Sequence, residues 1–408
     1  MRLDNFAKNN IIMFAASSIA SFFNLLYQLV MLKVMPREQF ASLNSLISLL
    51  VIMSVPAAAF TTMVTKHVSS YHARNNIEHL KAIWQRIARH TFYFSLGVFI
   101  LIILFRQHIA LFLHLDSLWS IVILGLMFFF SCVSSVVTGG LQGLERFKWL
   151  ALIGLSAGFL KLFFSVVLVK SISDMLLAGL IGFLLPTVLG IVFSLWPLRF
   201  LIQGLSREKV EVKGLYLYVF PVLTVSLCFA LVTNVDLVLV KHFFLREAQD
   251  YSVAQMVGKI ILSIPGAIYV VMFSRASNLH AVKTNSREIL KRSLIYTFIL
   301  SFSAVALYNL FPGSIFKILA GGVNKEVVLL GRLFSLSMLF YALSNVLCTY
   351  QLSIERYGFI KMLVPVVILQ IIAICLFHQT TSGVLGIMLA GSLLIFVLNL
   401  KSALYQKA

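Results

Sequence analysis

Long apolar runs separated by short polar stretches dominate this chain of 408 residues. Each run is close to the roughly 20 apolar residues that a helix needs to cross a bilayer. The runs lie near residues 10–32, 41–64, 91–113, 118–140, 149–169, 175–197, 214–240, 251–274, 293–313, 326–349, 358–377 and 383–400. This pattern predicts an all-α, polytopic membrane protein with about twelve transmembrane helices.

Composition excludes an ordinary soluble protein. Hydrophobic residues make up 60% of the chain, charged residues only 12%, and the mean hydropathy is +0.97. A soluble domain needs more charge than this to cover its exterior, whereas a bilayer is itself an apolar solvent. The first apolar run is too long for a signal peptide and lacks a small-residue cleavage site, so we expect a retained span.

The net charge of +19 is better explained by membrane topology than by a nucleic-acid partner. The N-terminus, alternate loops and the C-terminus hold 22 Lys and Arg residues, and the opposite set of loops holds 8. The smaller set consists of Lys33, Arg37, Arg106, Lys170, Lys241, Arg246, Lys317 and Lys325. Because basic residues favour the cytoplasmic side, both termini are predicted to be cytoplasmic.

Tryptophan and cysteine positions agree with this map. Every tryptophan lies just outside or at the end of a predicted span, where headgroups would meet the ring; these are Trp84, Trp119, Trp149 and Trp196. The cysteines fall inside apolar runs without metal-ligand spacing, and we interpret them as small packing residues; these are Cys132, Cys228, Cys348 and Cys375.

An internal repeat divides the chain into two halves. SVPAAAFTTMVTK (54–66) matches SIPGAIYVVMFSR (263–275) at an offset of 209, and LERFKWL (144–150) matches IERYGFI (354–360) at an offset of 210. LVMLKVMPREQFAS and LVLVKHFFLREAQDYS form a third pair upstream. We expect two six-helix lobes, 1–206 and 207–408, in the same orientation, with a binding site between them. Pro56 and Pro265 occupy matching places and favour packing kinks, with a moving hinge as the alternative.

Three segments carry a family resemblance: KVMPREQFASLNSLISLL, GGLQGLERFKWLAL and NVDLVLVKHFFLREAQDYSVAQMVGKIILSIPGAIYVVMFSRAS. They resemble the oligosaccharide (polysaccharide) flippases of the multidrug/oligosaccharidyl-lipid/polysaccharide exporter superfamily. The resemblance implies a V-shaped, two-lobed fold with a central cavity and alternating access. It also implies transfer of an undecaprenyl-diphosphate-linked oligosaccharide to the periplasmic leaflet of the bacterial inner membrane. The partners implied are that substrate, membrane lipid, a polysaccharide polymerase and a chain-length regulator.

Four charged residues lie inside predicted spans: Lys161, Asp236, Lys259 and Arg332. A charge exposed to lipid is costly, so such residues usually face a cavity or a partner. Their formal sum of +2 has the sign needed to hold a diphosphate. Arg332 offers a bidentate donor, although an ordinary interfacial arginine is an equal alternative.

Polar neighbours extend this candidate substrate site. Ser252, Gln255, Lys259 and Ser263 form a polar stripe at helical spacing, as expected of a cavity-lining face. The alternative for Lys259 is snorkelling to the headgroups. Asp236 either neutralises Lys259 or binds a coupling ion, and at a shift of 208 its counterpart is Gln28, which shares a helix face with Asn24.

Lys161 shares a face with Gly154 and Gly158, a GxxxG pair that is typical of helix packing. We therefore expect its side chain to point into protein rather than into lipid. The glycines themselves are interpreted as packing residues.

Two alternatives remain open. A multidrug or cation exporter of the same superfamily would share the fold, but its cavity should be acidic. A membrane glycosyltransferase or polymerase would need clustered carboxylates or a large periplasmic loop, and the chain has only 14 acidic residues. No GxxxxGK[ST] phosphate loop and no metal-ligand motif occurs, so we expect neither an enzyme nor a cofactor nor a metal.

Overall fold

The computed structural model describes residues 2–74, 76–204, 215–281, 284–315 and 325–404. Within these ranges every regular element is a helix, which confirms the predicted all-α class. The basic linker beyond residue 204, together with Lys283 and Lys317, lies outside the described residues.

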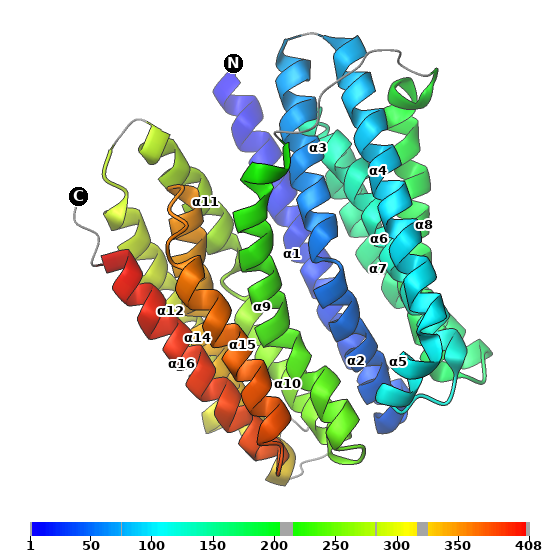
Figure 1. Ribbon diagram of the computed structural model, residues 1–408, viewed down its shortest axis with the longest axis vertical. Helices are drawn as coiled ribbons and strands as arrows, with labels where there is room; N and C mark the ends of the chain where they lie inside the picture. The colour runs from blue at the N-terminus through cyan, green and yellow to red at the C-terminus, as the bar shows by residue number, and fades with distance from the viewer. Residues whose placement is uncertain (1, 75, 205–214, 282–283, 316–324, 405–408) are drawn as a thin grey trace. The chain divides into compact units, whose positions relative to one another are not determined.

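The chain forms two compact units, Met1–Phe220 and Pro221–Ala408. Unit 1 contains α1 (Arg2–Val34), α2 (Arg37–Met53), α3 (Val55–Ala73), α4 (Ile77–Leu104), α5 (Arg106–Phe112), α6 (Leu118–Gly143), α7 (Phe147–Ser171) and α8 (Met175–Ile202). Within unit 1, the start of α1, the α3–α4 turn and the end of α8 lie at the same end of the helices (Figure 1).

Unit 2 is also built from helices alone within its described residues. It contains most of α9 (Leu215–Phe243), then α10 (Glu247–Ser263), α11 (Gly266–Ala281), α12 (Arg287–Leu310), α14 (Lys325–Ser353), α15 (Ile360–Leu376) and α16 (Thr381–Leu404). The boundary between the two units falls inside α9, between Phe220 and Pro221.

Most of these helices have the length and composition of membrane spans. Eight described helices qualify singly, and a ninth span results if α2 and α3 are counted together. Ser18–Val34 of α1 and all of α15 are shorter apolar helices. The chain is therefore a multi-pass membrane protein, although the number of spans identified by these criteria is smaller than twelve.

Two of the predicted spans are helix pairs rather than single kinked helices. The run 41–64 is broken at Ser54, where α2 and α3 meet at 42°. Pro56 lies in the first turn of α3, where its missing N–H costs no helical hydrogen bond. The run 251–274 is likewise divided between α10 and α11, with Pro265 between them. Both prolines thus mark helix starts.

The connections that follow α6 and α14 have the same backbone path. Glu145 and Glu355 both have φ 55°, in the left-handed region. In the first turn the Arg146 N–H donates to the Leu141 carbonyl, and in the second the Arg356 N–H donates to the Gln351 carbonyl, each at 2.9 Å. Glu145 and Arg146 belong to the LERFKWL segment, and Glu355 and Arg356 to the IERYGFI segment, so the sequence repeat corresponds to a repeated turn.

Small residues on α6 bring it close to its neighbours in unit 1. A Cβ on Gly139 would lie 2.7 Å from the Thr61 carbonyl oxygen of α3. A Cβ on Gly143 would lie 2.6 Å from Val68 Cβ. Contact of this kind between backbones is how membrane helices gain packing energy where lipid supplies no hydrophobic drive.

One tryptophan departs from the predicted interfacial positions. Trp84 is buried in the core of unit 1, and its indole lies against α6 because Gly140 has no side chain to block it. Trp119 and Trp196 are exposed, as the prediction requires. Three of the four cysteines are buried as predicted, whereas Cys375 is exposed.

Candidate functional site

Lys161 of α7 points into unit 1, as its GxxxG neighbours predicted. Its ammonium group donates a hydrogen bond to Asn24 Oδ1 of α1. The Nζ atom also lies 4.4 Å from the ring centroid of Tyr27 and 4.6 Å from that of Phe183. Two aromatic faces and an amide oxygen therefore stabilise the cation without neutralising it.

Close packing of α7 on α1 creates this arrangement. A Cβ on Gly158 would lie 3.2 Å from Phe23 Cβ and 3.5 Å from Ala20 Cα, so this glycine is a packing residue. Gly154, the first glycine of the GxxxG pair, has no atom within 4 Å of such a Cβ and so does not pack in this way. Gln28 is half-buried on α1, one residue beyond Tyr27.

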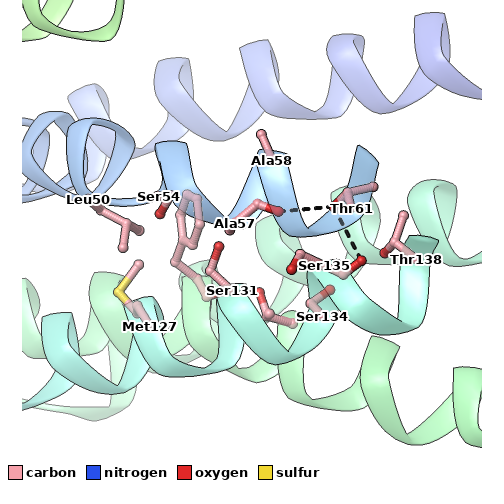
Figure 2. A pocket seen from close by; sticks show the side chains of 12 residues that line it. Leu50, Ser54, Ala57, Ala58, Thr61, Met127, Ser131, Ser134, Ser135 and Thr138 are labelled. Atoms are coloured by element: carbon pink, nitrogen blue, oxygen red, sulfur yellow. Dashed lines mark hydrogen bonds between the residues drawn. The ribbon is translucent and has the colours of Figure 1, made fainter. Parts of the chain in front are cut away.

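A pocket of about 390 Å³ lies beside this lysine in unit 1. Its lining comes from α2, α3, α6, α8 and the bend between α2 and α3, and is rich in hydroxyl groups (Figure 2). The lining residues are Leu50, Ser54, Ala57, Ala58, Thr61, Met127, Ser131, Ser134, Ser135, Thr138, Phe183 and Thr187. Phe183 both lines the pocket and contacts the Lys161 ammonium, so the pocket and the cation meet at this ring.

The hydroxyl groups of the pocket differ in whether they are already hydrogen-bonded. The Thr61 hydroxyl donates to the carbonyl oxygens of Ala57 and Ser135, each at 3.2 Å (Figure 2). Ser131, Ser134 and Thr138 make no hydrogen bond within the described part of the chain. Hydroxyls that are not bonded to their own helix can donate to and accept from a polyol.

The hydroxyl pocket was missed in the sequence, although a signal was present. Ser131, Ser134, Ser135 and Thr138 recur at helical spacing along α6. A polar face on an otherwise apolar span predicts a lined cavity as well as packing. Its position opposite the α2–α3 break could not be read from α6 alone.

Asp236 of α9 lies at the centre of a polar cluster in unit 2. Its side chain is fully buried. Tyr251 donates a hydrogen bond of 3.0 Å to Oδ2, and Gln255 Nε2 lies 3.2 Å from each carboxylate oxygen. Both donors come from α10, so these hydrogen bonds hold the first two helices of unit 2 together while satisfying the buried carboxylate.

Lys259 belongs to the same cluster. Its ammonium group donates a hydrogen bond of 2.9 Å to Asn234 Oδ1, two residues before Asp236, and it interacts electrostatically with the Asp236 carboxylate. Along the predicted stripe, Ser252 and Gln255 are buried, Lys259 is half-buried and Ser263 is exposed. The stripe thus runs from the interior of unit 2 to its surface.

Arg332 lies apart from these contacts. It is exposed on α14 and is close enough to Tyr308 of α12 for an electrostatic interaction. Phe334 of α14, by contrast, packs against the Asp236 cluster, with its ring centroid 5.3 Å from that of Tyr251. The structure therefore brings together Asp236, Gln255 and Lys259 in unit 2, and Lys161 with Asn24 in unit 1.

Among the described residues, no group of three or more His, Cys, Asp or Glu side chains could hold a metal ion. The available chemistry is instead that of fixed cations, amides and hydroxyls. Such groups bind an anionic, hydroxylated ligand without any covalent step.

A family model described as "Polysaccharide biosynthesis protein" matches residues 72–328, which is more than half of the chain. The chain therefore belongs to this family. No curated protein matches it in sequence.

Solved structures of transporters share the fold. A multidrug resistance MATE family transporter of the MOP superfamily, inward-facing, has a TM-score of 0.76 at 12% identity, covering 97% of this chain and 96% of that one. The lipid II flippase MurJ, inward closed, has a TM-score of 0.75 at 15% identity, covering 96% and 87%. The eukaryotic MATE transporter AtDTX14 has a TM-score of 0.68 at 13% identity, covering 99% and 96%. At these identities the likeness concerns the fold.

Proposed function

We propose that this protein is a flippase for a lipid-linked oligosaccharide, carrying an undecaprenyl-diphosphate-linked glycan from the cytoplasmic to the periplasmic leaflet of the bacterial inner membrane. Its family, polysaccharide biosynthesis, supplies the substrate class. Its fold is shared with a lipid II flippase. No covalent chemistry is required of the protein, because the substrate leaves with the bonds with which it entered.

The observation that carries the proposal is the meeting of a cation and a hydroxyl-lined pocket at Phe183. The Lys161 ammonium lies 4.6 Å from the centroid of this ring, and the same ring lines the pocket. A lipid-linked glycan presents an anionic diphosphate joined directly to a sugar. The lysine matches the first group, and the hydroxyls of Ser131, Ser134 and Thr138 match the second.

Charge balance supports an anionic substrate. A sugar diphosphate ester carries about two negative charges, which must be compensated when it leaves water. The Asp236 carboxylate offsets Lys259 locally, so Lys161 and Arg332 provide the uncompensated charge. We assign Lys161, Lys259, Arg332, Gln255, Asn24 and Gln28 to substrate binding, and Asp236 to an ion pair with Lys259.

Transport would follow from alternating access between two lobes, 1–206 and 207–408. The glycan would cross through a polar cleft while the polyprenyl chain stays in lipid. Both termini would be cytoplasmic, as the distribution of Lys and Arg favours. A polysaccharide polymerase and a chain-length regulator are the proposed partners, since consumption of the product would give the transfer a direction.

Multidrug export is the second candidate, because the structure is equally similar to MATE transporters. An exporter of organic cations needs an accessible carboxylate. Asp236 is fully buried and already accepts hydrogen bonds from Tyr251 and Gln255. The charges inside the spans therefore favour an anionic substrate.

Complementation of a flippase-deficient strain tests the proposal. Wild-type protein should restore surface glycan and remove the accumulated lipid-linked precursor. Lys161→Ala, Lys259→Ala and Arg332→Ala should each impair export at near-normal protein abundance. Normal export by all three neutral variants would refute the electrostatic mechanism. Drug resistance without glycan export would favour the multidrug alternative.

A further inference from the structure

A second pocket, of about 320 Å³, lies in unit 1 where α7 begins and α8 ends. Its lining consists of Arg146, Trp149, Trp196, Pro197, Arg199 and Phe200. Two guanidinium groups and three aromatic rings meet there, and no carboxylate is among the lining residues. The pocket is therefore electropositive, and the glycan-transport proposal does not use it.

Arg146 is fixed against one wall of this pocket. Its Nη1 group donates a hydrogen bond to the carbonyl oxygen of Pro197, and its guanidinium carbon lies 5.6 Å from the ring centroid of Phe200. A guanidinium has five N–H donors in a planar fork. Within the described residues the others make no hydrogen bond, so they remain available to an anion.

Arg199 approaches the pocket from α8. Its guanidinium carbon lies 5.4 Å from the ring centroid of Trp196, and the side chain is exposed. Its guanidinium makes no hydrogen bond within the described ranges. Arginine forks match the geometry of phosphate oxygens better than ammonium groups do.

The surroundings place this pocket at the depth of lipid headgroups. Trp196 is 68% exposed at the end of α8. One turn earlier Val192 and Phe193 are exposed, and Leu152 is exposed on α7. Such an apolar surface suits acyl chains, and an exposed tryptophan at its border prefers the headgroup layer. A soluble anion has no apolar part that could contact this surface.

We infer that this pocket binds the phosphate of an anionic phospholipid headgroup, with Arg146 and Arg199 as its ligands and the lipid chains on α7 and α8. The inference goes beyond the proposed transport function, because it holds whatever the transported substrate is. This end of unit 1 would then bind anionic phospholipid in preference to neutral phospholipid. Near a membrane surface, one contact between an arginine of this pocket and the anionic headgroup is worth about fivefold in affinity.

Quenching of tryptophan fluorescence by brominated lipid tests the inference. Full-length protein is reconstituted into vesicles of equal phosphatidylglycerol and phosphatidylcholine, with bromine on the chains of one lipid or the other. Wild-type protein should be quenched more by brominated phosphatidylglycerol. Trp196→Phe should remove part of that excess, since the indole lies in the pocket lining.

Substitutions of the two arginines test whether they bind the headgroup. The preference for phosphatidylglycerol over phosphatidylcholine should fall about fivefold in Arg199→Gln and further in Arg146→Gln/Arg199→Gln. Arg89→Gln, a control at an exposed arginine of α4 outside the lining, should retain it. Equal quenching by the two lipids in wild-type protein, or an equal loss in Arg89→Gln, would overturn the inference. If added inorganic diphosphate abolishes the preference for phosphatidylglycerol, the pocket binds a free anion instead. If the preference persists in the presence of diphosphate, the result supports the lipid.

Discussion

Glu145 and Glu355 occupy equivalent turns in the two units, 210 residues apart in sequence, and both have φ 55°. A left-handed conformation costs a non-glycine residue roughly 1 kcal/mol. Neither turn contains a glycine at this position, although glycine would adopt it freely. The same backbone is thus retained twice at a local cost, which supports a common origin for the two halves.

Substitution by glycine should relieve this cost. We expect Glu145→Gly and Glu355→Gly each to raise the apparent melting temperature, by an amount equivalent to roughly 0.5–1 kcal/mol. Glu145→Val should lower it, because a β-branched residue tolerates positive φ poorly. The control is Glu78→Gly in the first turn of α4, which should be destabilising. Lower stability in both glycine variants of the turns would contradict the assignment of strain.

Topology is testable at two exposed positions of unit 1. A cysteine at Lys148, just after the α6–α7 turn, should react with membrane-impermeant reagents only from the cytoplasmic side. A cysteine at Asp116, between α5 and α6, should react from the periplasm. The reason is the uneven distribution of basic residues between the two sets of loops. Reversed labelling would invert the proposed orientation, and a cysteine at Arg246 provides the check in unit 2.

The helical class and the repeat could be predicted because both depend on local sequence. Apolar runs mark helices wherever the solvent is lipid, and the LERFKWL and IERYGFI segments specify the same turn. The breaks at Ser54 and near Pro265 were harder, since a proline in an apolar run fits either a kink or a new helix. Burial of Trp84 depended on Gly140, a residue of another helix.

The candidate site was only partly readable for a similar reason. Lys161, Asp236 and Lys259 stood out because a charge in an apolar span is rare. Their partners, such as Asn24 and Tyr251, could not be assigned, because the partner of a side chain depends on how helices pack. The hydroxyl pocket was missed because serine and threonine in a membrane helix usually bond to their own backbone.

Packing of α3 on α6 should depend on the glycines of α6. Gly139→Ala would place a Cβ 2.7 Å from the Thr61 carbonyl and 2.8 Å from Val64 Cβ. We expect a loss of roughly 1–3 kcal/mol of stability, since backbone must move to relieve the overlap. Gly97→Ala on α4 is the matched control. Its Cβ would meet no atom within 4 Å, so stability should rise by up to about 1 kcal/mol. The comparison is made by thermal unfolding in one detergent, and an unchanged Gly139→Ala protein would contradict close packing here.

The Lys161 charge should be needed for transport more than for folding. Lys161→Gln should reduce glycan export at least tenfold, the effect of losing one charge-assisted hydrogen bond of about 1.5 kcal/mol or more. Lys161→Arg should retain more activity, because a guanidinium can also stack on Tyr27 and Phe183. Lys170→Gln, at an exposed lysine in the last turn of α7, should export normally. Equal export by Lys161→Gln and Lys170→Gln would remove Lys161 from the site.

Substitution of Asp236 distinguishes a role in an ion pair with Lys259 from a role in binding a coupling ion. Asp236→Asn keeps the shape of the side chain and an oxygen for the Tyr251 hydroxyl, but removes the charge opposite Lys259. We expect it to lower stability by roughly 1–3 kcal/mol, as expected when a buried charged hydrogen-bond acceptor is replaced. Export per folded molecule should be largely retained.

The double variant Asp236→Asn/Lys259→Gln should recover part of the stability, because neither charge is then left without the other. Thermal unfolding and precursor export are measured on the same variants. Normal stability with selective loss of export in Asp236→Asn would contradict the ion-pair role and identify Asp236 as a coupling site.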